Sequence, residues 1–218
     1  MSNRVKKVGI LTAGGLAPCL SASIGYLIEA YTRKAPQVEI ICYVNGYMGL
    51  LQGKSLLVTP EVRQNWKAFV EHGGSPIGNS RVKLTNTADL VKRGLVPEGV
   101  DPLQYAADRL QEDGVDVLHT VGGDDTSTTA ADLAAHLDQQ GYPLTVVGLP
   151  KTIDNDLAGT DYTFGFDTAV SIAAEAIDRL RTTGDSHRRC MVLEVMGRDV
   201  GWIALHSGMA GGAQAMLI

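Results

Sequence analysis

Residues 115–149 read VDVLHTVGGDDTSTTAADLAAHLDQQGYPLTVVGL. The two ends of this stretch, 115–121 and 144–149, are apolar runs of the length of a buried strand. Between them, apolar residues recur at helical spacing over 126–140, and Gly141 stands where a helix would end. A strand, a helix and a second strand in this order predict one crossover of a parallel sheet.

The same order repeats on the N-terminal side of this stretch. Asp101-Pro102 supplies a helix cap and a first-turn proline, and Gly114 ends that helix directly before the next strand. Further strands are predicted at 5–12, 38–44 and 190–196, helices from about Ser21 and over 168–181, and short elements with loops over 45–97. The predicted fold class is α/β: a three-layer, Rossmann-like, mainly parallel sheet with helices on both faces.

The composition narrows the class of protein. With 44% hydrophobic and 20% charged residues, the chain has the balance of a folded protein rather than a disordered one. The net charge is −5 and the basic residues are scattered, so we expect no nucleic-acid partner. No apolar run reaches about 18 residues and no signal core follows the N-terminus, so we expect no membrane partner and a cytoplasmic protein. The three cysteines are expected to be reduced and buried.

Glycines follow the predicted strand 5–12, and glycines with two acids follow the predicted strand 115–121. Ligands of open parallel sheets bind beyond the carboxyl ends of the strands. Gly14-Gly15 would let backbone amides approach a phosphate, although such glycines also serve ordinary tight turns. Asp124 and Asp125 would cap a helix, yet two adjacent acids after two glycines favour a carboxylate reserved for Mg²⁺. The dinucleotide fingerprint and the standard P-loop motif are both absent from the sequence.

The segment after the run 144–149 carries a cation, a hydroxyl and two carboxylates: Lys151, Thr152, Asp154 and Asp156. An Asp-Asn-Asp sequence also occurs in plain turns. A lysine can neutralise a phosphate and an aspartate can accept the proton of a sugar hydroxyl, so this set favours phosphoryl transfer. Arginines at 188, 189 and 198 flank the run 190–196 and offer cations at both of its ends.

Taken in order, the motifs resemble those of the phosphofructokinase family. They are GILTAGGLAP (9–18), GNSR (78–81), VGGDDTS (121–127), GLPKTIDNDLAGTDYTFGFDTA (148–169), EAIDRLR (175–181), SHRR (186–189) and EVMGRDVGW (194–202). The resemblance runs from about residue 5 to the end of the chain. It implies the phosphofructokinase fold, fructose 6-phosphate as acceptor and Mg²⁺ as cofactor.

The resemblance also assigns roles to residues. Gly14 would contact the phosphoryl donor, Asp124 would hold Mg²⁺, and Arg81 would stabilise the transferring phosphoryl group. Asp154 would be the general base on the sugar 1-hydroxyl. The implied contacts of fructose 6-phosphate are Thr152, Asp154, Asp156, Met196, Gly197, Arg198 and, from a neighbouring subunit, Arg189. A homodimer or homotetramer is therefore expected.

Two positions bear on the donor. Relatives that use ATP are similar to GGDG and PGTIDND, whereas this chain has Asp125 and Lys151 at the two variable places. Asp125 would oppose the inner phosphate of a nucleotide by bulk and charge, and Lys151 would favour a small, highly charged donor. The expected reaction is reversible phosphorylation of fructose 6-phosphate by pyrophosphate. The alternatives are an ATP-dependent phosphofructokinase and a non-catalytic phosphosugar-binding subunit.

The resemblance suggests two domains. Residues 1–165 would bind the donor and Mg²⁺, and 166–218 would begin a fructose 6-phosphate-binding domain that is only partly present, since Gln214–Ile218 looks like the middle of a strand. One departure concerns the first motif, where Leu16 replaces the acid of many relatives. The backbone role expected of Gly14 does not depend on that side chain.

Overall fold

The computed structural model describes residues 5–197 and 199–218, and it divides into two compact units. The first runs to Pro150 and the second begins at Lys151, earlier in the chain than the expected boundary after residue 165. In the described residues, no helix is both long enough and apolar enough to cross a bilayer.

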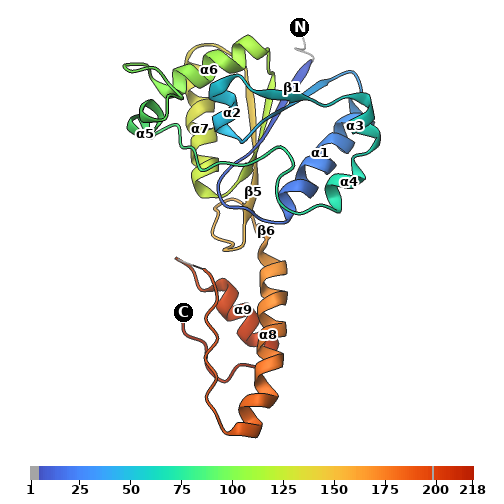
Figure 1. Ribbon diagram of the computed structural model, residues 1–218, viewed down its shortest axis with the longest axis vertical. Coiled ribbons are helices and arrows are strands. Elements are labelled where there is room, and N and C mark those ends of the chain that lie inside the picture. Colours follow the sequence, from blue (N-terminus) through green and yellow to red (C-terminus); the bar gives the residue numbers. More distant parts are fainter. Residues whose placement is uncertain (1–4, 198) are drawn as a thin grey trace. The chain divides into compact units, whose positions relative to one another are not determined.

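A mainly parallel sheet forms the centre of the first unit (Figure 1). Its strands are β1 (Lys7–Thr12), β2 (Glu39–Tyr43), β3 (Ser55–Leu57), β4 (Val117–Gly122) and β5 (Thr145–Thr152). The sheet order is β3-β2-β1-β4-β5-β6, and within residues 5–197 and 199–218 the edge strand β3 alone pairs antiparallel. The last two residues of β5, Lys151 and Thr152, pair with the two-residue strand β6 (Phe164–Gly165) of the second unit.

Helices cover both faces of this sheet (Figure 1). They are α1 (Cys19–Lys34), α2 (Tyr47–Gln52), α3 (Pro60–Gln64), α4 (Lys67–Val70), α5 (Thr87–Lys92), α6 (Pro102–Asp113) and α7 (Asp124–Gln139). Side chains alternate along β1, so Leu11 packs toward α2, α6 and α7, whereas Val8 and Ile10 pack toward α1. The α/β class with two covered faces is confirmed.

The predicted helix boundaries rest on identifiable caps. The Asp101 carboxylate accepts a hydrogen bond from the Leu103 N–H at 3.2 Å, which starts α6. Gly114 ends the same helix in the left-handed conformation with φ 67°. Residues 45–97 form short helices, β3 and loops, as predicted.

The second unit consists mainly of α8 (Phe166–His187) and α9 (Trp202–Gly211), which pack against each other (Figure 1). The prediction of a strand at 190–196 is wrong, and so is the prediction of strand structure at 214–218. The residue types suit a strand, but neither segment has a neighbouring strand with which to form a ladder in the described part of this unit, and a strand requires such a partner. Val192 is consequently 87% exposed.

The three cysteines form no disulfide with one another, and their burial differs from the prediction. Cys42 is buried on β2, Cys19 is half-buried and Cys190 is exposed. Cys190 is the first residue of the segment 190–196 that lacks a strand partner, which explains its exposure.

Candidate active site

The site begins where β1 and β4 lie side by side. The chain leaves β1 toward β2 on one side and leaves β4 toward β5 on the other, so the carboxyl ends of these two strands form a topological switch point. Thr12 is in register with Val121, and the Ala13 N–H donates to the Val121 carbonyl at 3.0 Å. The turns that follow, at Gly14-Gly15 and Gly122-Gly123-Asp124, therefore lie at the same edge of the sheet.

The turn at Gly14 is held by backbone and side-chain hydrogen bonds. Gly14 has φ 87°, a conformation that favours glycine. Its N–H donates to the Ser80 carbonyl at 2.9 Å, and its carbonyl accepts from Asn79 Nδ2 at 2.6 Å. The Gly14 N–H is thus hydrogen-bonded within the protein. The Gly15 N–H has no hydrogen-bond partner among the described residues.

The loop that holds Gly14, residues 75–80, is itself fixed to β1. Thr12 Oγ1 donates to the Gly78 carbonyl at 2.9 Å and lies 2.8 Å from Ser75 Oγ. Gly78 has φ 77°, and a Cβ atom there would lie 2.0 Å from Asn45 Oδ1. The left-handed backbone therefore favours glycine at this position, and any other residue would also displace the Asn45 side chain.

Asp124 and Asp125 begin α7, immediately after β4. Asp125 Oδ2 forms an ion pair with Lys83 Nζ at 2.8 Å. The Asp124 side chain is exposed and has no hydrogen bond or ion pair with any described residue. Negative charge is favourable at a helix N-terminus, so both acids also stabilise the start of α7.

Asp124 fits a Mg²⁺ ion. A carboxylate without a protein partner offers the hard oxygen ligand that Mg²⁺ prefers, and Mg²⁺ bound with phosphates usually takes only one or two protein carboxylates. In the described ranges, no group of three or more His, Cys, Asp or Glu side chains gathers as metal ligands.

Arg81 and Lys83 lie on the same side of an extended segment. Val82, between them, is buried in the core, and its two neighbours are exposed. Side chains alternate in extended chain, so both cations face outward, and Lys83 contacts Asp125. The sequence analysis did not identify Lys83 as a site residue. Its position two residues after Arg81, which puts both side chains on the same side, could have indicated it.

Within the second unit, the chain turns sharply after β5. Lys151 is only 4% exposed, a rare state for lysine and one in which its charge is costly unless compensated. Thr152 Oγ1 accepts a hydrogen bond from the Asp154 N–H at 3.2 Å. Asp154 is half-buried, and its carboxylate makes no hydrogen bond or ion pair with the described residues. Its two oxygens can therefore accept further hydrogen bonds.

Asn155 holds the loop that follows Asp154. Its backbone is left-handed with φ 57°, Oδ1 accepts from the Thr163 N–H at 2.9 Å, and Nδ2 donates to the Asp161 carbonyl at 3.3 Å. Asn155 is thus a structural clamp that the sequence analysis did not single out. Asp156, next to it, is exposed.

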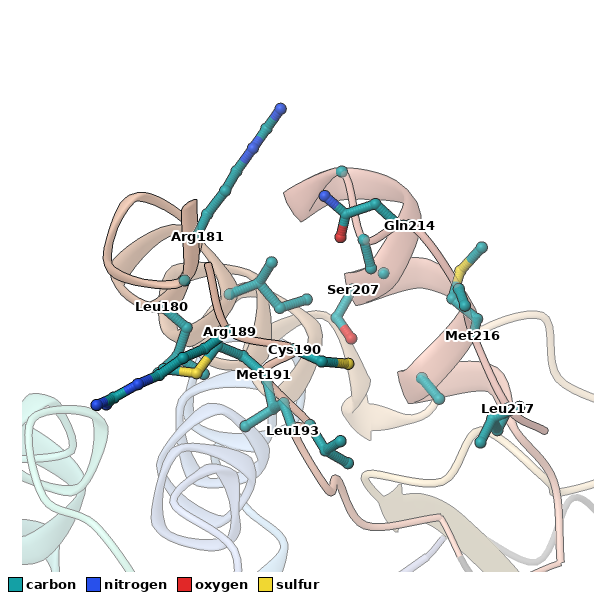
Figure 2. Close-up of a pocket in the computed structure, with 18 of the residues that line it drawn as sticks. Leu180, Arg181, Arg189, Cys190, Met191, Leu193, Ser207, Gln214, Met216 and Leu217 are labelled. Carbon is teal, nitrogen blue, oxygen red and sulfur yellow. The ribbon is translucent and has the colours of Figure 1, made fainter. Parts of the chain in front are cut away.

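The remaining predicted contacts lie in the second half of the second unit. Arg189 is exposed, Met196 is 74% exposed and Gly197 has φ 126°. Arg198 lies outside the described residues. A cavity of about 680 Å³ lies among α8, α9 and the segments 188–195 and 212–217. In Figure 2 the guanidinium end of Arg189 points away from the apolar side chains of Met216 and Leu217.

The structure therefore places the predicted residues in two groups. In the first unit it brings Gly14 to the same sheet edge as Asp124, and Lys83 connects Asp125 to the segment of Arg81. In the second unit, Lys151 and Thr152 end β5, and Asp154 and Asp156 lie in the loop that follows it. Arg189 and Met196-Gly197 belong to separate segments of that unit.

Comparison with known proteins is consistent with this arrangement. The sequence model described as "Phosphofructokinase" matches residues 7–218. A pyrophosphate–fructose 6-phosphate 1-phosphotransferase of Methylotuvimicrobium alcaliphilum is 56% identical over 208 residues, which are 95% of this chain and 51% of that protein. An ATP-dependent 6-phosphofructokinase of Chloroflexus aggregans is 44% identical, covering 100% of this chain and 57% of that protein.

A solved structure shares the fold. The pyrophosphate-dependent phosphofructokinase of Marinobacter aquaeolei matches with a TM-score of 0.77 and 25% identity, over 95% of this chain and 50% of that one. The chain spans about half the length of curated relatives that it matches. The matched family, the parallel sheet and the motifs at its carboxyl edge agree, and the chain belongs to the phosphofructokinase family.

Proposed function

We propose that the full-length protein transfers a phosphoryl group reversibly from pyrophosphate to the 1-hydroxyl of fructose 6-phosphate, giving fructose 1,6-bisphosphate and phosphate. The observation that carries this proposal is Asp125, which begins α7 at the switch point and is paired with Lys83 at 2.8 Å. The relative that is 56% identical carries the name of this activity.

The choice of donor follows from charge. A carboxylate at position 125 repels the inner phosphate of a nucleotide and occupies space beside it, and its ion pair with Lys83 holds it in place. The buried Lys151 adds positive charge to the turn that carries Asp154, which suits a small and highly charged donor. The ATP-dependent relative at 44% identity keeps ATP as the less favoured alternative.

The reaction requires an in-line displacement at phosphorus. Asp154 accepts the proton of the sugar 1-hydroxyl, the new O–P bond forms, and the bond to the bridging oxygen of pyrophosphate breaks, releasing phosphate. Asp124 would hold Mg²⁺, which supplies charge neutralisation to the phosphate oxygens when bound. Arg81 stabilises the negative charge on the transferring group.

The acceptor would contact the second unit. Thr152, Asp156 and the Met196-Gly197-Arg198 segment are proposed to bind fructose 6-phosphate, and the exposed Arg189 would reach the sugar phosphate of a neighbouring subunit. This last role makes the working form a homodimer or homotetramer, and we place it in the cytoplasm with other enzymes of sugar phosphate metabolism.

Product formation tests this proposal. The full-length protein is incubated with Mg²⁺, fructose 6-phosphate and either pyrophosphate or ATP, and fructose 1,6-bisphosphate is measured through an aldolase-coupled assay. We expect product with pyrophosphate, and a decrease in kcat of about 10²- to 10⁴-fold in Asp154→Asn, because a general base is lost. Asp161→Asn makes the same chemical change on an exposed side chain of the same loop and should leave kcat unchanged.

Two results would contradict the proposal. Product from ATP alone would make the protein an ATP-dependent enzyme, and binding of fructose 6-phosphate without product from either donor would indicate a phosphosugar-binding subunit.

A further inference from the structure

The Asn79 side chain has an unusual set of contacts for a loop residue. Its Nδ2 donates to the Gly14 carbonyl at 2.6 Å, whereas its Oδ1 is buried and has no hydrogen-bond partner among the described residues. The orientation of the amide is fixed by this pairing, because exchanging Nδ2 and Oδ1 would set two oxygens against each other. A buried acceptor without a partner costs folding free energy.

The contact with Gly14 determines where the next amide points. The peptide bond between Gly14 and Gly15 is trans, so the Gly14 carbonyl and the Gly15 N–H point in opposite directions. With the carbonyl held toward Asn79, the Gly15 N–H is turned away from the loop 75–80. This N–H has no partner among the described residues, and Gly15 follows β1 at the switch-point edge.

The rest of the loop keeps Asn79 in place. Thr12 Oγ1 binds the Gly78 carbonyl at 2.9 Å, and Ser80 Oγ donates to the Asn45 carbonyl at 2.7 Å. Ser80 also accepts the Gly14 N–H, so both polar groups of Gly14 are held by adjacent residues of one anchored loop. Rotation of the Gly14-Gly15 peptide would break the contact with Asn79.

We propose that Asn79 is a positioning residue for the phosphoryl donor: it holds the Gly14 carbonyl and thereby presents the Gly15 N–H to a pyrophosphate oxygen. This inference rests on the proposed function, because it assigns pyrophosphate to the switch point. Asn79 itself does not touch the donor. Without the Asn79 side chain, the Gly14-Gly15 peptide can rotate, and the Gly15 N–H is no longer held in position to donate to pyrophosphate.

Pyrophosphate affinity in asparagine variants tests the inference. Calorimetry of the full-length protein with Mg²⁺ and pyrophosphate gives the dissociation constant, and steady-state assays give KM for each substrate. In Asn79→Ala we expect the dissociation constant and KM for pyrophosphate to rise about ten-fold or more, because a hydrogen bond to a charged group is lost. We expect KM for fructose 6-phosphate and the melting temperature to stay near the wild-type values.

Two further variants complete the design. Asn79→Asp keeps the size of the side chain but sets an oxygen against the Gly14 carbonyl, so it should also weaken pyrophosphate binding. This variant carries the test if Asn79→Ala does not fold. Asn86→Ala is the matched control, because Asn86 Oδ1 accepts from the Asp89 N–H at 3.3 Å at the start of α5, and its loss should leave pyrophosphate affinity unchanged.

The outcomes separate this inference from the proposed function. Wild-type affinity for pyrophosphate in both Asn79 variants would overturn it, and so would a lower melting temperature with no change in pyrophosphate affinity. A wild-type protein that binds pyrophosphate but forms no product would contradict the proposed function alone. A wild-type protein without affinity for pyrophosphate would overturn both.

Discussion

His119 is a buried histidine that serves the structure of the first unit. It lies on β4 with 7% of its surface exposed, its Nε2 is 2.8 Å from the Tyr31 hydroxyl of α1, and its ring meets that of Tyr31 edge to face. Burial lowers the pKa of His119 to about 4. The pair ties α1 to the sheet while the imidazole is neutral.

The depressed pKa predicts that the protein loses stability in mild acid. Below pH 6.5, the ordinary pKa of histidine, the unfolded chain takes up a proton at this position, and the folded chain does not do so until about pH 4. The free energy of unfolding should therefore fall as the pH drops through this interval, by up to roughly 3 kcal/mol. Urea unfolding at a series of pH values measures it.

His119→Gln provides the comparison for this prediction. The variant keeps every carboxylate of the wild type but has no titrating group at position 119, so its stability should fall less steeply between pH 6.5 and 4. Parallel curves for the two proteins would show that His119 does not titrate differently in the folded and unfolded states.

Single residues were predictable from sequence where a local rule applies. Asp101 and Gly114 were identified as helix ends because capping depends on the residue types at fixed positions. Asn79 and Asn155 were not, because their hydrogen bonds join segments that are far apart or irregular, as with the contact from Asn79 to Gly14. Nothing in the local sequence indicates such a partner.

At the scale of elements, the loop 75–80 has a glycine, Gly78, whose backbone and surroundings both oppose a side chain. Gly78→Ala places a Cβ at 2.0 Å from Asn45 Oδ1 and also strains a backbone with φ 77°. We expect a loss of about 1–3 kcal/mol in unfolding free energy, measured by chemical denaturation. Because the displaced loop also carries Asn79, KM for pyrophosphate should rise.

Gly99→Ala is the matched control for this loop. Gly99 has φ 79°, but a Cβ there would meet no atom within 4 Å, so the substitution adds similar backbone strain without the clash. It should cost less stability than Gly78→Ala and leave KM for pyrophosphate unchanged. Equal effects of the two substitutions would show that the packing of the loop against Asn45 is unimportant.

Elements of the first unit were predictable, and those around 190–218 were less so. The runs 115–121 and 144–149 correspond to β4 and β5 because each has a neighbour in the sheet. The run 190–196 has strand-like residues but no such neighbour in the described second unit. The pattern of apolar residues shows that a segment prefers the strand conformation. A strand also needs a neighbouring strand to pair with, and the sequence of the segment does not specify that neighbour.

At the scale of the whole molecule, the order of the strands explains why the site residues are dispersed in sequence. β1 and β4 are adjacent although Thr12 and Val121 are far apart in the chain, and this adjacency unites Gly14 with Asp124. The sequence predicted both turns as sites, because ligands of parallel sheets bind at carboxyl ends. The adjacency of β1 and β4 and the ion pair of Lys83 with Asp125 required the structure.

The donor preference is the central claim, and a double substitution tests it most directly. In Asp125→Gly with Lys151→Gly, the full-length protein is assayed for kcat/KM with pyrophosphate and with ATP. Removing the repulsive carboxylate and the buried cation should shift the ratio of the two kcat/KM values toward ATP by about a hundred-fold or more, since a misplaced like charge costs several kcal/mol. An unchanged ratio in a folded double variant would contradict the proposed basis of donor selection by Asp125 and Lys151.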